Sequence, residues 1–556
     1  MADSETKAQA ASTEPVAAAA ASNGSVHTDE VAPSTEFRGE RDDSLKAHFR
    51  FVWVTLLVGC ALLEYGFDKS IVGSFQAMVG FLKVFGYEDP RVPAGWNIAA
   101  GPQQIISSFM LLGAFISCFA AGPLGSFCGR RWCILLGIIL LVASIIIMII
   151  TTSLGVLYFS RLMMGFGNGL VMTFTMIYVA ELAPSKLRGI AYGFMTTWIT
   201  AGSAIGLLIA DSTNSIDSKL CYQIPLYVLF AMPVVVVTTI FFLPESPRWL
   251  LLNGKEDEAL KSLTWIRNGA YDKLALQTEF EEMRLNAQHD LETQSLWLVL
   301  DLFKGTNLRR TILCVGIGCI NPGIGAMFIL AFGTYFFKMV GVIDPFKWIV
   351  LTQWIGVIGL LLAWYCLDRW GRRTLLLLGS TMCCLSMLVL AIIFTIPPLS
   401  TNAMSIAIIF LVSWFQFWFN FGVVPTVYLV SGELPAQNLR AYTSGLSTGF
   451  GYVFGWLTTF TAPYFINPAE LNWKGKYGYI WFGSSFLVIA FIWFMIPEVQ
   501  GRSLEEIEEM FNKRLPAKEF PKYVSETAEI ARQEARRDLY GDEKGGVMHV
   551  EGDKRV

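Results

Sequence analysis

The feature that most constrains the fold of this chain is a series of long apolar runs, which recur from Phe51 to beyond Ile480. A helix needs roughly 20 apolar residues to cross the hydrocarbon core of a bilayer, and about twelve runs reach that length. Only 16% of the 556 residues are charged, whereas charged residues make up roughly one quarter of a soluble domain. The sequence therefore predicts an all-α membrane protein with about twelve transmembrane helices.

The segments outside these runs predict the domain organisation. Residues 1–46 are rich in Ala, Ser, Glu and Asp and lack periodicity, which is typical of a disordered tail. Lys and Arg concentrate in the even-numbered loops, and the positive-inside rule then puts those loops and both termini in the cytoplasm. We expect a six-helix half at 47–248, a cytoplasmic linker with short helices at 249–310, a second six-helix half at 311–498 and a cytoplasmic tail at 499–556.

Composition and spacing also exclude several classes of function. The net charge of -3 and the absence of a basic face argue against a nucleic-acid partner. Most of the ten Cys lie within apolar runs without metal-ligand spacing, so we read them as small core residues. Because no nucleophile–base or metal constellation is present, we expect neither an enzyme nor a bound cofactor or metal. The lipid bilayer is the expected partner of the runs.

Three charged landmarks occur twice in the same order, which indicates an internal repeat. A Gly-Arg-Arg triplet recurs after 371 − 129 = 242 residues, and a Pro-Glu pair recurs with its Glu shifted by 498 − 245 = 253 residues. A Glu and an Arg that are seven residues apart recur after 433 − 181 = 252 residues. Two similar parallel halves with a site between them at mid-depth are the plan of a transporter.

The charged residues at and near these landmarks are candidates for a cytoplasmic gating network. We expect ion pairs among them to form when the protein opens outward and to break when it opens inward. For any single Arg, a charge that only fixes the membrane topology is the alternative. The candidates are Arg130, Arg131, Glu181, Arg188, Glu245, Asp368, Arg369, Arg372, Arg373, Glu433, Arg440 and Glu498.

Arg161 is a cation within an apolar run and is followed by Gly165, Gly167 and Gly169. Such a charge costs roughly 3 kcal/mol or more in lipid, so it should face a partner or a water-filled cavity. Because Arg161 lies near the start of its run, a side chain that extends to the membrane surface is the alternative. The glycines allow another helix or a ligand to approach the backbone closely.

Glu64 and Asp68 lie four residues apart in the first run, so a regular helix places them on one face. Two carboxylates in apolar surroundings repel each other and are poorly solvated, which favours proton binding near neutral pH. Arg161 is the natural counter-ion of Asp68, and exchange of this partner for a proton would couple proton movement to a second solute. The alternative is a static ion pair that only orients the first and fourth helices.

The seventh run contains Pro322 and four glycines between Gly316 and Gly325, which predicts a broken helix that lines a cavity. Aromatic residues follow in this run, and the tenth run adds aromatic and amide side chains. Aromatic faces with a few amides suit a ring-shaped polyol or a flat heterocycle, although aromatics at helical spacing are more often packing residues. The candidate substrate-binding residues are Thr196, Asn321, Phe328, Phe332, Tyr335, Asn420 and Tyr428.

At these residues the chain resembles the sugar porter family of the major facilitator superfamily. The resemblance is carried by Gly66-Phe67-Asp68, Gly129-Arg130-Arg131, 181–189 (ELAPSKLRG), 244–250 (PESPRWL), 368–373 (DRWGRR) and 497–511 (PEVQGRSLEEIEEMF). Details such as 333–337 (GTYFF), 433–440 (ELPAQNLR) and 463–468 (PYFINP) are similar to fungal α-glucoside permeases of the maltose type. The resemblance implies a twelve-helix major facilitator fold, with Asp68 as the proton site and Arg161 as its partner.

The departures from the family pattern concern the sugar site. Thr196 and Tyr428 stand where the family has a sugar-binding Gln and Trp, and Ser126 replaces the Asp of the first cytoplasmic loop motif. The Gln pair and Asn of the seventh helix fall near Pro322, Gly323 and Phe328. A hydroxyl-rich ligand loses roughly 1–3 kcal/mol per buried partner left unpaired, so we do not expect glucose or maltose as the preferred substrate.

These observations lead to three hypotheses. The first is a proton-coupled carrier of a small sugar or sugar-like polyhydroxy compound across the plasma membrane. The second is an exporter of a small sugar-derived metabolite, such as an organic acid or a hydroxypyranone like kojic acid. The third is a nutrient sensor with the same fold that does not transport.

Overall fold

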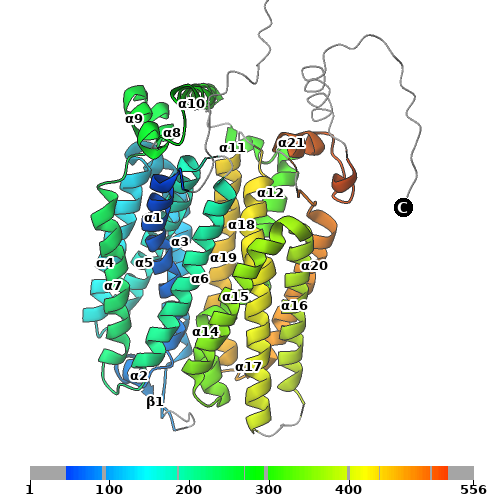
Figure 1. Ribbon diagram of the computed structural model, residues 1–556. Coiled ribbons are helices and arrows are strands. Elements are labelled where there is room, and N and C mark those ends of the chain that lie inside the picture. The colour runs from blue at the N-terminus through cyan, green and yellow to red at the C-terminus, as the bar shows by residue number, and fades with distance from the viewer. Residues whose placement is uncertain are drawn as a thin grey trace, which may run out of the picture.

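The computed structural model describes residues 46–90, 95–184, 187–267, 269–293, 298–396, 401–436, 439–500, 502 and 504–523. The predicted disordered segment 1–46 lies almost wholly outside the described residues, as does the tail beyond 523. The described chain forms a long helical bundle, with the first half and the second half side by side (Figure 1).

The first half contains six long helices, which form where the sequence has its first six apolar runs. A short helix and a two-stranded antiparallel sheet, in which Tyr87 pairs with Asn97, follow the first long helix. The elements are α1 (Phe49–Phe75), α2 (Val79–Phe85), β1 (Tyr87–Glu88), β2 (Trp96–Asn97), α3 (Ala100–Cys128), α4 (Arg130–Ile150), α5 (Leu154–Leu182), α6 (Arg188–Thr213) and α7 (Leu220–Ile240).

The linker folds into short helices, and the residues after the bundle add one more. Ser246 caps the first linker helix by accepting a hydrogen bond from the backbone N–H of Trp249, and Pro247 occupies its first turn. These helices are α8 (Pro247–Leu252), α9 (Glu256–Arg267), α10 (Lys273–Thr293), α11 (Leu298–Asp301) and α21 (Leu504–Asn512). They lie at one end of the bundle, here called the linker end, whereas α2 and β1 lie at the opposite sheet end (Figure 1).

The second half has more interruptions than the first. Two of its crossings are built from several helical pieces, one of which is a π-helix. The elements are α12 (Gly305–Gly318), α13 (Ile320–Gly323), α14 (Ala326–Val340), α15 (Pro345–Trp370), α16 (Arg372–Ile393), α17 (Thr401–Trp418), η2 (Phe419–Val423), α18 (Val424–Glu433), α19 (Arg440–Ile466), the 3-10 turn η3 (Lys474–Tyr477) and α20 (Gly478–Met495).

The predicted twelve-helix fold is confirmed, although two crossings have an unusual composition. Among the described residues, ten helices are long and apolar enough to cross a membrane. The other two crossings are the broken series α12, α13 and α14, and α19, which is rich in Gly and Thr. With 27 residues, α19 spans about 40 Å, which exceeds the hydrocarbon thickness of a bilayer.

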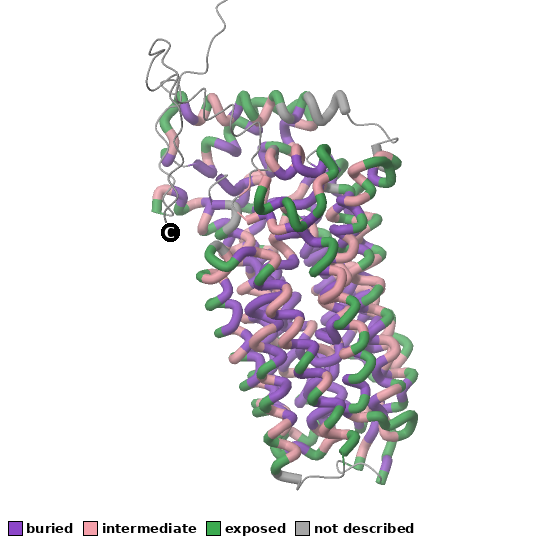
Figure 2. Tube along the Cα trace, turned by 90° about the vertical axis from the view of Figure 1, so that its right-hand side faces the viewer, coloured by how far each residue is buried: buried purple, intermediate pink, exposed green. Residues whose placement is uncertain are grey.

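Each half has its own hydrophobic core. One cluster of buried residues comes almost entirely from α1 to α7, and a second comes almost entirely from α12 to α21. Figure 2 shows the buried residues along the middle of the bundle and exposed residues along its outer surfaces. The two cores are therefore largely separate, with one in each half.

Candidate functional site

The buried ion pair between α1 and α5 is the centre of the first half. Nη1 of Arg161 donates a hydrogen bond to Oδ1 of Asp68 at 2.7 Å, and the two side chains are 1% and 0% exposed. Nε of Arg161 donates to the carbonyl of Ile106 in α3 at 3.2 Å. Arg161 lies two turns inside α5, so its side chain does not extend to the membrane surface.

Glycines set the close approach of the helices that carry this pair. A Cβ placed on Gly165 of α5 would overlap the carbonyl oxygen of Met110 in α3, and one on Gly66 of α1 would overlap the carbonyl of Ile199 in α6. Gly167 and Gly169 face α4 and α3 in the same way. The expectation that glycines admit a neighbouring helix is therefore confirmed, and this contact fixes the position of Arg161 relative to α3.

Two buried carboxylates, that of Asp68 in the pair and that of Glu64 nearby, have oxygens without a hydrogen-bond partner among the described residues. Among the described residues, both carboxylate oxygens of Glu64 and Oδ2 of Asp68 lack a hydrogen-bond partner. Glu64 is 0% exposed. An ionised carboxylate without a partner is costly in apolar surroundings, so these oxygens are places where a proton could be held.

A small cavity of about 60 Å³ lies between the two halves. Its wall is formed by α1 and α6 from the first half and by α13, α14, α15, η2 and α18 from the second. Four of the predicted binding residues, Thr196, Asn321, Asn420 and Tyr428, line it. The polar lining residues are Tyr65, Lys69, Thr196, Thr200, Ser203, Asn321, Gln353, Asn420 and Tyr428.

Irregular backbone brings two amides of the second half, those of Asn321 and Asn420, to this cavity. The predicted break in the seventh crossing is confirmed: α12 ends at Gly318, and Gly325 has a left-handed φ of 81° before α14 begins. Oδ1 of Asn321, inside the break, is buried and has no hydrogen-bond partner among the described residues. Asn420 lies in the π-helix η2, a local geometry that is frequent at functional sites.

Three of the predicted binding residues are not among the residues that line the cavity. Phe328, Phe332 and Tyr335 are at most 1% exposed and belong to the core of the second half. The ring of Phe328 packs against the ring of Tyr477 at 5.3 Å. The hydroxyl of Tyr335 donates to Oδ1 of Asn97 at 3.2 Å, near the sheet end. These positions correspond to the packing alternative for aromatics at helical spacing.

Sequence reasoning missed Tyr65, Lys69 and Gln353, which all line the cavity. Lys69 had a usable signal, because it is a charge within an apolar run, the same criterion that singled out Arg161. Tyr65 precedes Lys69 by four residues and so shares its helix face. Oε1 of Gln353 accepts a hydrogen bond from Nε2 of Gln416 at 2.6 Å, a contact between helices that the sequence does not announce.

At the linker end, the sequence repeat is also a structural repeat. Oε1 of Glu245 accepts hydrogen bonds from the backbone N–H groups of Arg130 at 3.0 Å and Arg131 at 3.2 Å. In the second half, Glu498 accepts the backbone N–H groups of Arg372 at 3.1 Å and Arg373 at 3.0 Å. Each carboxylate therefore caps the N-terminus of a helix, which the helix dipole favours. Burial raises the pKa of the Glu245 carboxyl, whereas these backbone hydrogen bonds act in the opposite direction.

The side chains of the repeated arginines form ion pairs within each half. The Arg130 guanidinium binds both carboxylate oxygens of Glu181, at 2.9 and 3.0 Å, and the hydroxyl of Ser246 donates to the same carboxylate. In the second half, Nη2 of Arg372 lies 3.6 Å from Oε1 of Glu433. These pairs join helices of the same half, and their formation and breakage as the protein opens outward and inward stays a prediction.

The remaining gating candidates have other surroundings. The Arg369 guanidinium lies 4.0 Å from the centre of the Tyr365 ring. Nη1 of Arg131 donates to the carbonyl of Leu243, Nη2 of Arg373 donates to the carbonyl of Trp493, and Arg440 begins α19. The side chains of Asp368 and Arg188 lie outside the described part of the structure.

Comparison with known proteins decides the family. Residues 54–511 match the family described as "Sugar (and other) transporter". The chain belongs to this family of membrane transporters. The resemblance to sugar porters of the major facilitator superfamily is thereby confirmed, and the chain is a multi-pass membrane protein of a transporter family, which is not an enzyme class.

Several proteins and solved structures are similar to this member of the sugar transporter family. It is 28% identical over 460 residues to the "Major facilitator-type transporter ecdD" of Aspergillus rugulosus, which covers 80% of this chain and 84% of the relative. It is 26% identical over 490 residues to the "Maltose permease MAL31" of Saccharomyces cerevisiae, which covers 86% and 78%. The structure of the proton:xylose symporter XylE bound to 6-bromo-6-deoxy-D-glucose has a TM-score of 0.67 at 19% identity and covers 83% of this chain and 99% of XylE. This last likeness shows the fold.

In this transporter, a buried polar network joins the halves near the sheet end. Nδ2 of Asn97 donates to Oδ1 of Asn467 at 3.4 Å, and Nδ2 of Asn467 donates to the carbonyl of Ile98 at 2.9 Å. The hydroxyls of Ser74 and Thr334 lie 3.1 Å apart. The sheet end is therefore closed in this structure. Asn97 and Asn467 are not among the residues that the sequence patterns singled out as candidates.

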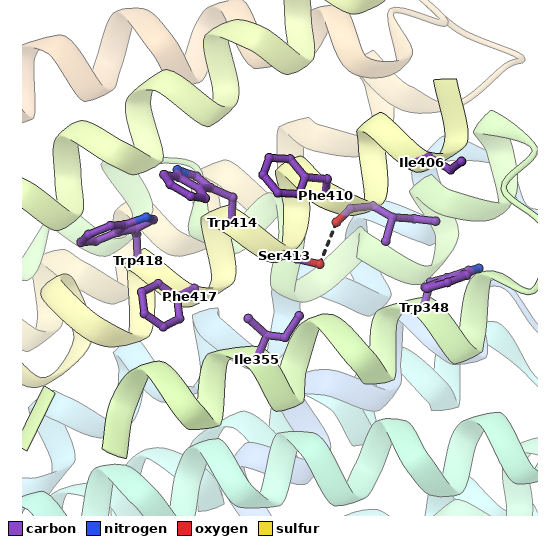
Figure 3. Close-up of a pocket in the computed structure, with 9 residues that line it drawn as sticks. Trp348, Ile355, Ile406, Phe410, Ser413, Trp414, Phe417 and Trp418 are labelled. Carbon is purple, nitrogen blue, oxygen red and sulfur yellow. Dashed lines mark hydrogen bonds between the residues drawn. The ribbon is translucent and has the colours of Figure 1, made fainter. Parts of the chain in front are cut away.

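A larger surface groove of about 470 Å³ is distinct from the central cavity. It lies between α15 and α17 and is lined by aromatic and aliphatic side chains such as Trp414 and Phe410, the latter 61% exposed (Figure 3). Its one hydroxyl, that of Ser413, donates to the carbonyl of Ile409 at 2.7 Å. Such an apolar groove suits contact with lipid acyl chains and has few polar groups for a hydrophilic solute.

Proposed function

We propose that this protein is a proton-coupled transporter of a small sugar or sugar-like polyhydroxy compound, which works by alternating access in the plasma membrane. The observation that carries the proposal is the fully buried ion pair of Asp68 and Arg161 at 2.7 Å. Asp68 lies on α1, the same helix as Tyr65 and Lys69, which line the cavity. A change of charge at Asp68 is therefore made on the helix that contacts the solute.

The mechanism follows from the cost of buried charge. While Asp68 is ionised, its attraction to Arg161 holds α1 against α5. When Asp68 takes up a proton, this attraction is lost and α1 is free to change its position relative to α5. Glu64, one turn earlier on the same helix, is a second place for a proton. Loss of the proton on the other side of the membrane restores the pair and returns the helix.

Alternating access needs the two ends of the bundle to open in turn. The network of Asn97 and Asn467 keeps the sheet end closed in the described state. Opening that end requires these buried hydrogen bonds to be replaced by water, while the two hydrophobic cores stay intact. The names "Maltose permease" and "proton:xylose symporter" of similar proteins support the choice of a sugar-like solute and of coupling to protons.

The test is Asp68→Asn in vesicles with an imposed pH gradient. We expect the variant to lose accumulation driven by the pH gradient while exchange of the solute across the membrane persists, because the amide fits the site but carries no titratable charge. Asp344→Asn is the matched control, since Asp344 is exposed, pairs with Lys347 at 3.1 Å, and has a left-handed φ of 53° that Asn tolerates. Undiminished accumulation by Asp68→Asn would refute coupling through this residue.

Export of a small sugar-derived metabolite, such as a hydroxypyranone or an organic acid, is the second candidate. It is favoured by Thr196, which lines the cavity where sugar porters have a longer Gln. Cells that lack the protein should then retain more of the metabolite. A deletion strain with no extra intracellular product would argue against export.

A further inference from the structure

The cavity wall contains a cation that the proposed mechanism does not use. Lys69 lies on α1 directly after Asp68 and lines the space between the halves. Among the fourteen residues that line this cavity, it is the one charged side chain, and none is a carboxylate. A cation at membrane depth is expensive unless it faces water or a partner of opposite charge.

No group of the described protein serves as the counter-ion of Lys69. The structure gives its ammonium no ion pair or hydrogen bond among the described residues. The adjacent Asp68 is engaged by Arg161. Glu64 precedes Lys69 by five residues, which puts it about 140° around the helix on a different face. The positive charge of this cavity-lining residue therefore has no counter-ion among the described residues.

We propose that Lys69 binds an anionic group of the transported solute, so that the substrate is a small polyhydroxylated carboxylate, such as a sugar acid, in preference to a neutral sugar. This inference rests on the proposed transport function and names the substrate class of the same cavity. The solute carboxylate supplies the counter-ion that the wall lacks. The buried Oδ1 of Asn321 accepts a hydrogen bond from a solute hydroxyl, and the amide of Gln353 and the hydroxyl of Tyr428 offer further polar contacts.

The charge of the solute has a consequence for energy coupling. A monoanion that moves with one proton carries no net charge across the membrane, whereas a neutral sugar that moves with one proton carries one positive charge. For an anionic substrate, accumulation therefore follows the pH gradient and is insensitive to an imposed membrane potential.

The experiment compares matched pairs of solutes in proteoliposomes. Counterflow exchange at equal pH on both sides is measured for gluconate against glucose, galacturonate against galactose, and glycerate against glycerol. For wild type we expect the exchange rate of the acid to exceed that of its neutral partner by about tenfold or more in at least one pair. This ratio corresponds to the contribution of one buried charge-assisted hydrogen bond. Lys69→Gln should abolish this preference, and Lys69→Arg, which keeps the charge, should retain most of it.

Two outcomes would overturn the proposal. One is exchange of the neutral partners at rates equal to or above those of all three acids in wild type. The other is an undiminished preference for the acid in Lys69→Gln, shown to be folded by an unchanged elution profile in detergent. Because counterflow needs no pH gradient, these results are independent of coupling through Asp68. If the neutral partners accumulate with the pH gradient and also match or exceed the acids in exchange, the proposed function stands and the role of Lys69 is refuted.

Discussion

In the first half, α1, α3 and α5 are uninterrupted helices of 27, 29 and 29 residues, whereas the second half breaks one crossing into α12, α13 and α14 and another at the π-helix η2. The uninterrupted helices hold the charged residues Asp68 and Arg161. The interrupted ones present the amides of Asn321 and Asn420 to the cavity. A charge in lipid needs a rigid partner at a fixed distance, whereas a solute needs polar groups on backbone that can adapt.

The linker end gives a second comparison between the halves. Glu245 and Glu498 cap equivalent helices with nearly equal distances. The neighbouring ion pairs differ, because Arg130 lies 2.9 Å from Glu181 while Arg372 lies 3.6 Å from its partner. The shorter pair is in the first half, where Ser126 stands in place of the Asp of the family's first cytoplasmic loop motif. Ser246, whose hydroxyl reaches the same carboxylate, supports that pair without the acid.

The largest expected effect concerns helix packing in the first half. Gly165→Leu should prevent accumulation of folded protein, because any side chain at this position overlaps the backbone of α3 at Met110. Gly445→Leu in α19 of the second half is the control, since a Cβ there meets open space. Elution profiles in detergent measure both variants. A monodisperse Gly165→Leu protein with wild-type yield would contradict the packing argument.

The next effect compares a charged contact with a neutral one. Arg161→Leu leaves Asp68 buried without its partner and should lower the free energy of unfolding by about 3–5 kcal/mol. Gln416→Leu in the second half leaves the amide of Gln353 unpaired and should cost about 1–3 kcal/mol. Thermal unfolding in detergent provides the ranking. The double variant Asp68→Leu with Arg161→Leu should recover most of the lost stability but none of the coupled transport, and failure of that recovery would indicate that the pair is not the cause.

The smallest effect sharpens the comparison at the linker end. Glu181→Gln should cost about 1 kcal/mol of stability, because it removes a two-point charge-assisted contact with Arg130. Glu433→Gln should cost less, since the distance to Arg372 is longer. The same thermal assay measures both. Equal losses, or a greater loss for Glu433→Gln, would mean that the two ion pairs are equivalent despite their different distances.

The sequence predicted those parts of the fold that the bilayer dictates. Lipid offers no hydrogen bonds to the backbone, so spans must be helical, and Pro322 with its glycines must mark a break that protein surrounds. The contact between Asp68 and Arg161 followed from the same reasoning, because two opposite charges in apolar runs have few other ways to be compensated. The repeat of Gly-Arg-Arg and Pro-Glu predicted two similar halves, and the caps by Glu245 and Glu498 are their common geometry.

Only the tertiary structure decided which face of each helix meets the cavity. Phe332 and Tyr335 are buried in a core, while Lys69 and Gln353 face the space between the halves. In a chain that is apolar on all sides, the sequence does not fix the rotation of a helix about its axis, and one residue changes the direction of a side chain by about 100°. The closed network at the sheet end also depends on the packing of both halves, since Asn97 and Asn467 are 370 residues apart in the sequence.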